Sequence, residues 1–191
     1  SALAHEINQP MAAARALARS AQEILRQPQA DVPRAEKNLA TAVAEIDLAS
    51  GIVRRMREFI RRGRLVAFPT VSRDSNLELI DFVRELLRPY GADVRLTFDD
   101  DRRKANLFAT VGPRDAAGGL VLSGHTDVVP VDGQAWDTDP FAMTERGGNL
   151  YGRGTADMKG FIAVALALVP ELKARGLRTP IHLALSYDEE V

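Results

Sequence analysis

Three short polar motifs carry side chains that could do chemistry, and the first is GLVLSGHTDVVP, residues 119–130. It places His125 and Asp127 just past an apolar, strand-like run, and ligands tend to bind at the carboxyl ends of strands in open α/β sheets. In a His-x-Asp sequence on extended backbone, both side chains point to the same side. Asp127 could accept a hydrogen bond from one ring nitrogen of His125, or from a neighbouring group, while the other nitrogen binds a metal ion.

The other two motifs add four carboxylates. YGRGTADMKG places Asp157 on a glycine-rich loop just before a predicted helix, and IHLALSYDEE places Asp188, Glu189 and Glu190 at the end of a predicted strand. Because the chain has no cysteine, any metal must be held by His, Asp and Glu. Such a set suits Zn²⁺ or another divalent ion, with a spare carboxylate as general base for water. Each motif alone is more often structural or a solvated loop, so their combination carries the prediction.

Strand-like and helix-like patterns alternate from Gly63 onward, which favours an α/β layered sheet. Ser75 followed by Glu78 is a capping-box signature that predicts a helix ending before Gly91. A second helix is predicted from about Gly160 to Arg175. The predicted strands are DVRLTF and ANLFATVG around the charged turn DDDRRK, the buried-looking run GLVLS, and IHLALS.

Residues 1–62 have a helical period instead. The break QPQADVP, residues 27–33, contains two prolines and separates two predicted helices, so we expect a helical hairpin. Because two helices alone bury little surface, we expect an apolar stripe on the second helix to meet a second copy in a four-helix bundle. The stripe consists of Leu39, Val43, Ile46, Ala49, Val53, Met56 and Ile60.

The composition is that of a soluble globular protein, with 46% hydrophobic and 27% charged residues and a formal net charge of -1. No apolar run reaches the roughly 18–20 residues that span a bilayer, and the first residues do not have the pattern of a secretory signal. We therefore expect no membrane segment and a cytoplasmic location. The basic cluster of residues 54–64 has no recognition motif, so a solvated helix face is favoured over nucleic-acid binding.

Residues 65–191 resemble the dinuclear-zinc amidohydrolases of the acetylornithine deacetylase, succinyl-diaminopimelate desuccinylase and aminoacylase group. The resemblance is carried by LVAFPTVSRDSNLELIDFV, KANLFATVGP, LSGHTDVVPVDGQAWDTDPF, LYGRGTADMKGF and HLALSYDEEV, and acetylornithine deacetylases match best. It implies two divalent metal sites, filled by zinc or by cobalt, in a zinc-aminopeptidase-like domain. It also implies that His125 binds one metal, Asp157 bridges both, Glu190 binds the other, Glu189 is the general base and Asp127 orients the histidine.

The implied reaction is hydrolysis of an N-acyl amino acid, N-acetylornithine in arginine biosynthesis, with no role for His182. In this family each metal takes a third ligand from sequence beyond the DEE motif, whereas this sequence ends at Val191. We therefore expect an incomplete catalytic domain with little or no deacetylase activity by itself.

Residues 1–63 resemble a different family, the dimerisation and phosphotransfer hairpin of sensor histidine kinases. SALAHEINQPMAAARALARS carries the resemblance, which implies that His5 is a phosphoacceptor with Glu6 as the adjacent base, in a hairpin that forms a homodimer. The bland alternative is a His-Glu pair on a helix surface. The sequence thus predicts a chimera, read either as a deacylase segment with a foreign helical leader or as a phosphotransfer module with an incidental tail.

Overall fold

The computed structural model describes the backbone of residues 2–61 and 63–191, and the side chains of residues 9–51, 53 and 63–191. The chain divides into two compact units, Ser1–Arg55 and Met56–Val191. Helix α2, Val32–Arg61, runs past the boundary, and otherwise each unit is described by itself. In the described part of the chain, no helix is long and apolar enough to cross a membrane.

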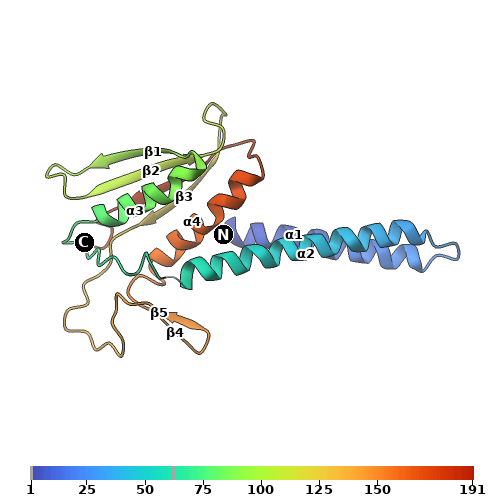
Figure 1. Ribbon diagram of the computed structural model, residues 1–191, viewed down its shortest axis with the longest axis horizontal. Helices are drawn as coiled ribbons and strands as arrows, with labels where there is room; N and C mark the ends of the chain where they lie inside the picture. Colours follow the sequence, from blue (N-terminus) through green and yellow to red (C-terminus); the bar gives the residue numbers. More distant parts are fainter. Residues whose placement is uncertain (1, 62) are drawn as a thin grey trace. The chain divides into compact units, whose positions relative to one another are not determined.

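The first unit is a helical hairpin, as predicted (Figure 1). Helix α1 spans Ala2–Leu25 and helix α2 spans Val32–Arg61. At the start of α2 the Asp31 side chain accepts a hydrogen bond from the amide of Arg34 at 3.1 Å. Between the helices the Asn38 amide donates to the Ser20 hydroxyl at 3.2 Å.

The interface between α1 and α2 is lined by alanines and not by the larger residues of the predicted apolar stripe, and this corrects the prediction. Among the described side chains of this unit, the buried alanines are Ala14, Ala21, Ala35, Ala42 and Ala49. Small side chains let two helices approach closely, and the spacing of seven residues keeps each set on one face. Ala49 is buried, whereas the other described residues of the stripe, Leu39, Val43, Ile46 and Val53, are exposed. The side chains of Met56 and Ile60 lie outside the described residues.

The second unit contains a four-stranded mixed sheet in the order β1-β2-β6-β3. Its strands are β1 Asp93–Phe98, β2 Ala105–Val111, β3 Leu120–His125 and β6 Ile181–Ser186. Strand β2 pairs antiparallel with β1 on one side and with β6 on the other, whereas β3 pairs parallel with β6. A separate hairpin joins β4 Thr144–Arg146 and β5 Asn149–Tyr151. The predicted α/β class and each of the four predicted strands are confirmed.

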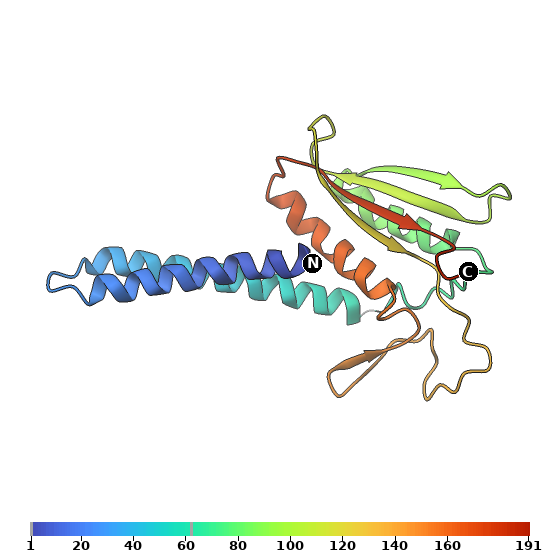
Figure 2. The same ribbon diagram turned by 180° about the vertical axis from the view of Figure 1, so that it is seen from behind.

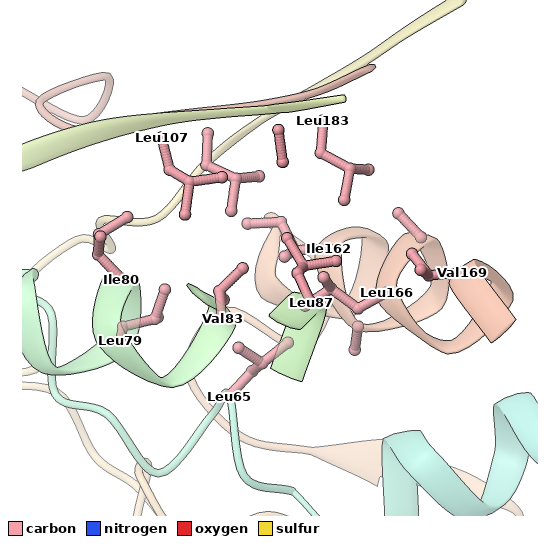
Figure 3. Close-up of a cluster of buried hydrophobic side chains, with 14 of the residues drawn as sticks. Leu65, Leu79, Ile80, Val83, Leu87, Leu107, Ile162, Leu166, Val169 and Leu183 are labelled. Atoms are coloured by element: carbon pink, nitrogen blue, oxygen red, sulfur yellow. The ribbon is translucent and has the colours of Figure 1, made fainter. Parts of the chain in front are cut away.

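Helices α3 Leu77–Leu87 and α4 Lys159–Ala174 cover one face of the sheet (Figures 1 and 2). Figure 3 shows the core between them, with Leu107 and Leu183 of the sheet above side chains of both helices. Strand β2 alternates buried and more exposed residues, as expected for a strand with one covered face. The largest contributors from the helices are Leu79, Ile80, Val83, Leu87, Ile162, Leu166 and Val169.

Two local predictions are wrong. The run GLVLS reads as buried, yet Leu120 and Val121 are 45% and 52% exposed, because β3 is the last strand in the order of the described sheet. The capping box also does not form. The N-cap of α3 is Asn76, with no side-chain capping bond, and the Ser75 hydroxyl accepts from the amide of Leu77 at 3.2 Å.

Candidate metal centre

The parallel pairing of β3 and β6 brings two of the predicted motifs together. His125, the last residue of β3, pairs in register with Ser186, the last residue of β6. The amide and the hydroxyl of Thr126 both donate to the Ser186 carbonyl at 2.8 Å. The residues after the two strands therefore leave the same edge of the sheet, where Asp157 also lies, two residues before α4.

His125 presents one ring nitrogen to carboxylates and the other to the protein interior. Its Nε2 atom lies 3.1 Å from Asp157 Oδ1 and 3.7 Å from Glu189 Oε2. Its Nδ1 atom lies 3.1 Å from the Asp127 carbonyl oxygen and 3.4 Å from Asp127 Oδ1. The imidazole is buried, whereas both facing carboxylates are exposed. In the tautomer protonated on Nδ1, the inner nitrogen donates to Asp127 and Nε2 can bind a cation.

Electrostatics at His125 favour a positive charge. Burial lowers the pKa of the imidazole, but the hydrogen bond with Asp157 and the nearby Asp127 and Glu189 raise it more, so the pKa lies above its usual value. In the protonated ring, Nε2 carries a proton at the position where a metal ion would bind. Metal binding at this position would therefore release a proton.

Asp127 is buried, and its carboxylate accepts hydrogen bonds from the turn that follows β6. Its carboxylate accepts hydrogen bonds from the Ser72 hydroxyl at 2.7 Å, the Glu190 amide at 3.0 Å and the Glu189 amide at 3.3 Å. Burial alone would raise the pKa of Asp127, but these hydrogen bonds outweigh it and the pKa lies below its usual value. Asp127 thus holds both the backbone of the acidic turn and, through its carbonyl, the ring of His125.

The donor set fits a divalent cation. Among the described residues, ligand atoms of His125, Glu189 and Glu190 lie within 4.8 Å of one another. Asp157 adds a fourth donor beside the same ring nitrogen. One imidazole nitrogen with carboxylate oxygens is a set that zinc and related divalent ions accept. The structure therefore brings together all the residues predicted for the site, although the division of labour among the carboxylates stays a prediction.

Sequence reasoning missed the segment 70–76, whose side chains form hydrogen bonds with the His-Thr-Asp motif. The Thr70 hydroxyl donates to the Thr126 carbonyl at 2.5 Å, and the Asn76 amide donates to the Thr126 hydroxyl at 2.9 Å. Ser72 reaches Asp127, as described above. These contacts join residues 50 to 56 positions apart. Because no spacing pattern marks such pairs, the sequence predicted a role in this segment only for Ser75, as a helix cap.

Lys159, in the DMKG motif, is fully buried, and its ammonium donates to the Phe68 carbonyl at 2.5 Å. Burial lowers the pKa of Lys159 to about 7, although the negative charge of Asp127 opposes this shift. The Asp127 charge therefore also compensates a buried lysine.

The remaining predicted residues fall into two groups. His182 lies half-buried in β6, stacked on Phe108, with its Nδ1 atom 3.0 Å from the Thr110 hydroxyl, which is a packed strand position as expected. His5 and Glu6 lie in α1, but their side chains are outside the described residues, so the phosphoacceptor site stays a prediction.

Comparison with known proteins supports the hydrolase interpretation of the second unit. Residues 121–191 match the model of peptidase family M20/M25/M40. Residues 121–191 are thus similar to M20 domains in sequence, and the predicted resemblance to this amidohydrolase group is confirmed at that level.

Among individual relatives, acetylornithine deacetylase of Shigella sonnei is 39% identical over 133 residues, which cover 66% of this chain and 34% of that protein. Acetylornithine deacetylase of Klebsiella pneumoniae is 41% identical over the same coverage. The chain therefore spans about a third of the length of these curated relatives.

Solved structures agree on the fold. Human carnosine dipeptidase 1 matches with a TM-score of 0.63 and 25% identity, over 72% of this chain and 33% of that one. The M20 family metallo-carboxypeptidase Sso-CP2 of Sulfolobus solfataricus matches with a TM-score of 0.58 and 23% identity, over 67% of this chain and 30% of that one. The resemblance of residues 1–63 to sensor histidine kinases stays a prediction.

Proposed function

We propose that residues 65–191 supply part of the active site of a metal-dependent amidohydrolase that cleaves N-acyl amino acids, with N-acetylornithine as substrate. The observation that carries this proposal is the convergence of two separate chain segments, those of Asp157 and Glu189, on the Nε2 atom of His125, which lies on a third. The names of the two curated relatives support the choice of substrate. In this proposal zinc is the metal.

Each residue at the site has a proposed role. His125, Asp157 and Glu190 would hold two divalent metal ions, and a bound cation would supply Lewis-acid polarisation of the amide carbonyl. The exposed carboxylate of Glu189 takes a proton from the attacking water and passes it to the amine leaving group, so that water and amide become carboxylate and amine. Asp127 keeps His125 in the correct orientation.

A hybrid enzyme tests this assignment. Residues 65–191 replace the matching segment of the Shigella sonnei relative, and release of ornithine from N-acetylornithine is measured with added zinc. The hybrid is expected to be active and to lose activity on chelation. Glu189→Gln in the hybrid is expected to lower kcat about a hundredfold with zinc content unchanged, because removal of a general base typically costs at least that factor.

Glu85→Gln is the matched control for the hybrid, since it makes the same change at an exposed residue of α3, whose surface ion pair with Arg88 contributes little. It should leave kcat unchanged. A folded, zinc-loaded hybrid that is inactive, or whose Glu189→Gln variant keeps full activity, contradicts the proposed function.

A second proposal concerns the hairpin. We infer that the first unit forms a homodimer through the exposed apolar face of α2. On this face Leu39, Val43, Ile46 and Val53 are 43%, 56%, 44% and 40% exposed, although they recur at helical spacing. The seam with α1 is already filled by alanines, so this second stripe offers its larger side chains to another surface. Because a copy of this chain carries the same stripe, two hairpins can bury it symmetrically.

Ile46→Glu is expected to convert the dimer into a monomer, because burying four apolar side chains per copy is opposed by a charge at the centre of the stripe. Size-exclusion chromatography with light scattering gives the mass directly. Ala44→Glu introduces the same charge at an exposed position of α2 outside the stripe and should leave the dimer intact. A parent chain that is monomeric at high micromolar concentration rules out this interface.

A further inference from the structure

The turn after β6 contains an acidic residue that is bound by a cation of the protein itself. Asp188 has a backbone φ of 58°, in the left-handed region that is unfavourable for most residues other than glycine, although Asp tolerates it better than most. Its carboxylate accepts a hydrogen bond from Lys104 at 2.5 Å. Of the three acidic residues of the DEE motif, only Glu189 and Glu190 belong to the metal-ligand cluster with His125. Asp188 therefore has a different partner and a different task.

Lys104 makes a second hydrogen bond, which connects it through Ser72 to Asp127. Its ammonium also donates to the Ser72 carbonyl at 2.6 Å, and the Ser72 hydroxyl donates to Asp127. Asp127 in turn accepts from the amides of Glu189 and Glu190, as described above. The hydrogen bonds thus form a closed circuit that begins and ends in the turn 188–190.

The strength of the Lys104–Asp188 ion pair depends on how well it is shielded from water. The side chains of Lys104 and Asp188 are 16% and 32% exposed. An exposed ion pair contributes little, whereas a charge-assisted hydrogen bond shielded from water is stronger and more directional. Lys104 also donates to two acceptors in segments far apart along the chain, 32 and 84 positions away. One side chain therefore sets the spacing between two segments of the site.

We propose that Lys104 is a positioning residue for the candidate metal centre, and this role rests on the proposed function. Its ammonium holds Asp188 and Ser72 together, which fixes the turn so that the amides of Glu189 and Glu190 donate to Asp127. The carboxylates of the two glutamates are then presented to His125. The hydrogen bonds of the Lys104 ammonium go to Asp188 and Ser72, which are not members of the metal-ligand cluster.

Amide hydrogen exchange in the full 191-residue chain without metal tests this role directly. Lys104→Met removes the ammonium and keeps the length of the side chain. The amides of Glu189 and Glu190 are expected to exchange at least tenfold faster, while the amide of Thr126, which donates to Ser186 across β3 and β6, keeps its rate. Lys104→Arg should restore part of the protection. Lys173→Met, the same change at an exposed position of α4, should change none of these rates.

Asp188→Asn provides a second variant, which decides the question if Lys104→Met does not fold. Asn tolerates the left-handed backbone as Asp does but lacks the charge that Lys104 binds. It is expected to expose the same two amides, and adding Lys104→Met to it should have little further effect. Unchanged exchange at Glu189 and Glu190 in a folded variant overturns the proposal. Loss of protection along the whole of β6, together with loss at Thr126, which donates to Ser186, overturns it as well, since that shows a general structural role.

Zinc titration separates this inference from the proposed function. In isothermal titration calorimetry, Lys104→Met is expected to weaken zinc binding about tenfold, as for other groups that orient metal ligands, and His125→Ala to weaken it further. If the parent chain binds zinc no better than His125→Ala, the proposed metal site is wrong, while the amide exchange still decides the role of Lys104. If His125→Ala loses zinc and Lys104→Met binds it as the parent does, only the positioning role fails.

Discussion

Replacing Gly160 with alanine is expected to unfold the loop that carries Asp157 and to cost more than about 3 kcal/mol of stability, because a rigid backbone contact leaves no room for a methyl group. A Cβ atom at this position would lie 2.0 Å from the carbonyl oxygen of Thr155. The loop is held against the start of α4, since the Gly160 amide donates to the Gly154 carbonyl at 3.1 Å. Neither side of this contact is a flexible side chain that can move away.

Helix propensity alone predicts the opposite sign, which makes this variant informative. Alanine in a helix is favoured over glycine by about 1 kcal/mol, so a Gly160→Ala variant without the contact would be more stable than the parent. Denaturant unfolding measures the sign, and zinc titration reports whether Asp157 still reaches His125. Gly118→Ala is the control: its Cβ would meet nothing within 4 Å, and only the left-handed backbone costs about 1 kcal/mol. A stabilised Gly160→Ala variant contradicts the packing of this loop.

Periodicity predicted the elements well where one face of an element is covered. Strand β2 alternates because its inward residues pack under α3 and α4, and the same pattern is visible in the sequence. Strand β3 shows the limit of this reasoning. Its apolar residues predict burial on both faces, whereas its place at the end of the strand order leaves Leu120 and Val121 exposed. Strand order depends on distant pairings, which a local pattern does not contain.

The hairpin shows a similar limit. Two sets of apolar residues recur every seven positions on α2, Ala35, Ala42 and Ala49 in one set and Leu39, Ile46 and Val53 in the other. Period alone merges them into one stripe. The size of the side chains separates them, because close approach of α1 requires the alanines, and the larger residues are then turned outward.

The candidate site divides in the same way. His125, Asp157, Glu189 and Glu190 could be found from sequence because each ends a strand, follows one or precedes a helix at one edge of an α/β sheet. Ser72 and Lys104 could not, because each is a single common residue whose partner lies 55 or 84 positions away. Residues that bind a metal or do chemistry form a recognisable motif in the sequence, whereas the residues that position them through hydrogen bonds do not.

Asp127→Asn is expected to destabilise the second unit by about 3–5 kcal/mol and to weaken zinc binding by up to about a hundredfold. The two side chains have nearly the same shape, so the effect comes from hydrogen bonding and charge. Both oxygens of Asp127 accept from backbone amides, one from Glu189 and the other from Glu190. In either orientation of the Asn side chain, its NH₂ group faces one of these N–H donors, and a buried donor without an acceptor is costly.

The loss of charge adds to this effect. The negative charge of Asp127 opposes the downward shift in the pKa of the buried Lys159, so the neutral Asn leaves that ammonium with less compensation. Guanidinium unfolding should show a lower midpoint with an unchanged slope, and calorimetry should show the weaker zinc affinity. Asp132→Asn makes the same chemical change at an exposed carboxylate paired with Arg73 at 2.9 Å and should alter neither measurement. If Asp127→Asn unfolds at the parent's midpoint and binds zinc as tightly, then the carboxylate does not organise the turn, and the geometry of the site must be set by the strands alone.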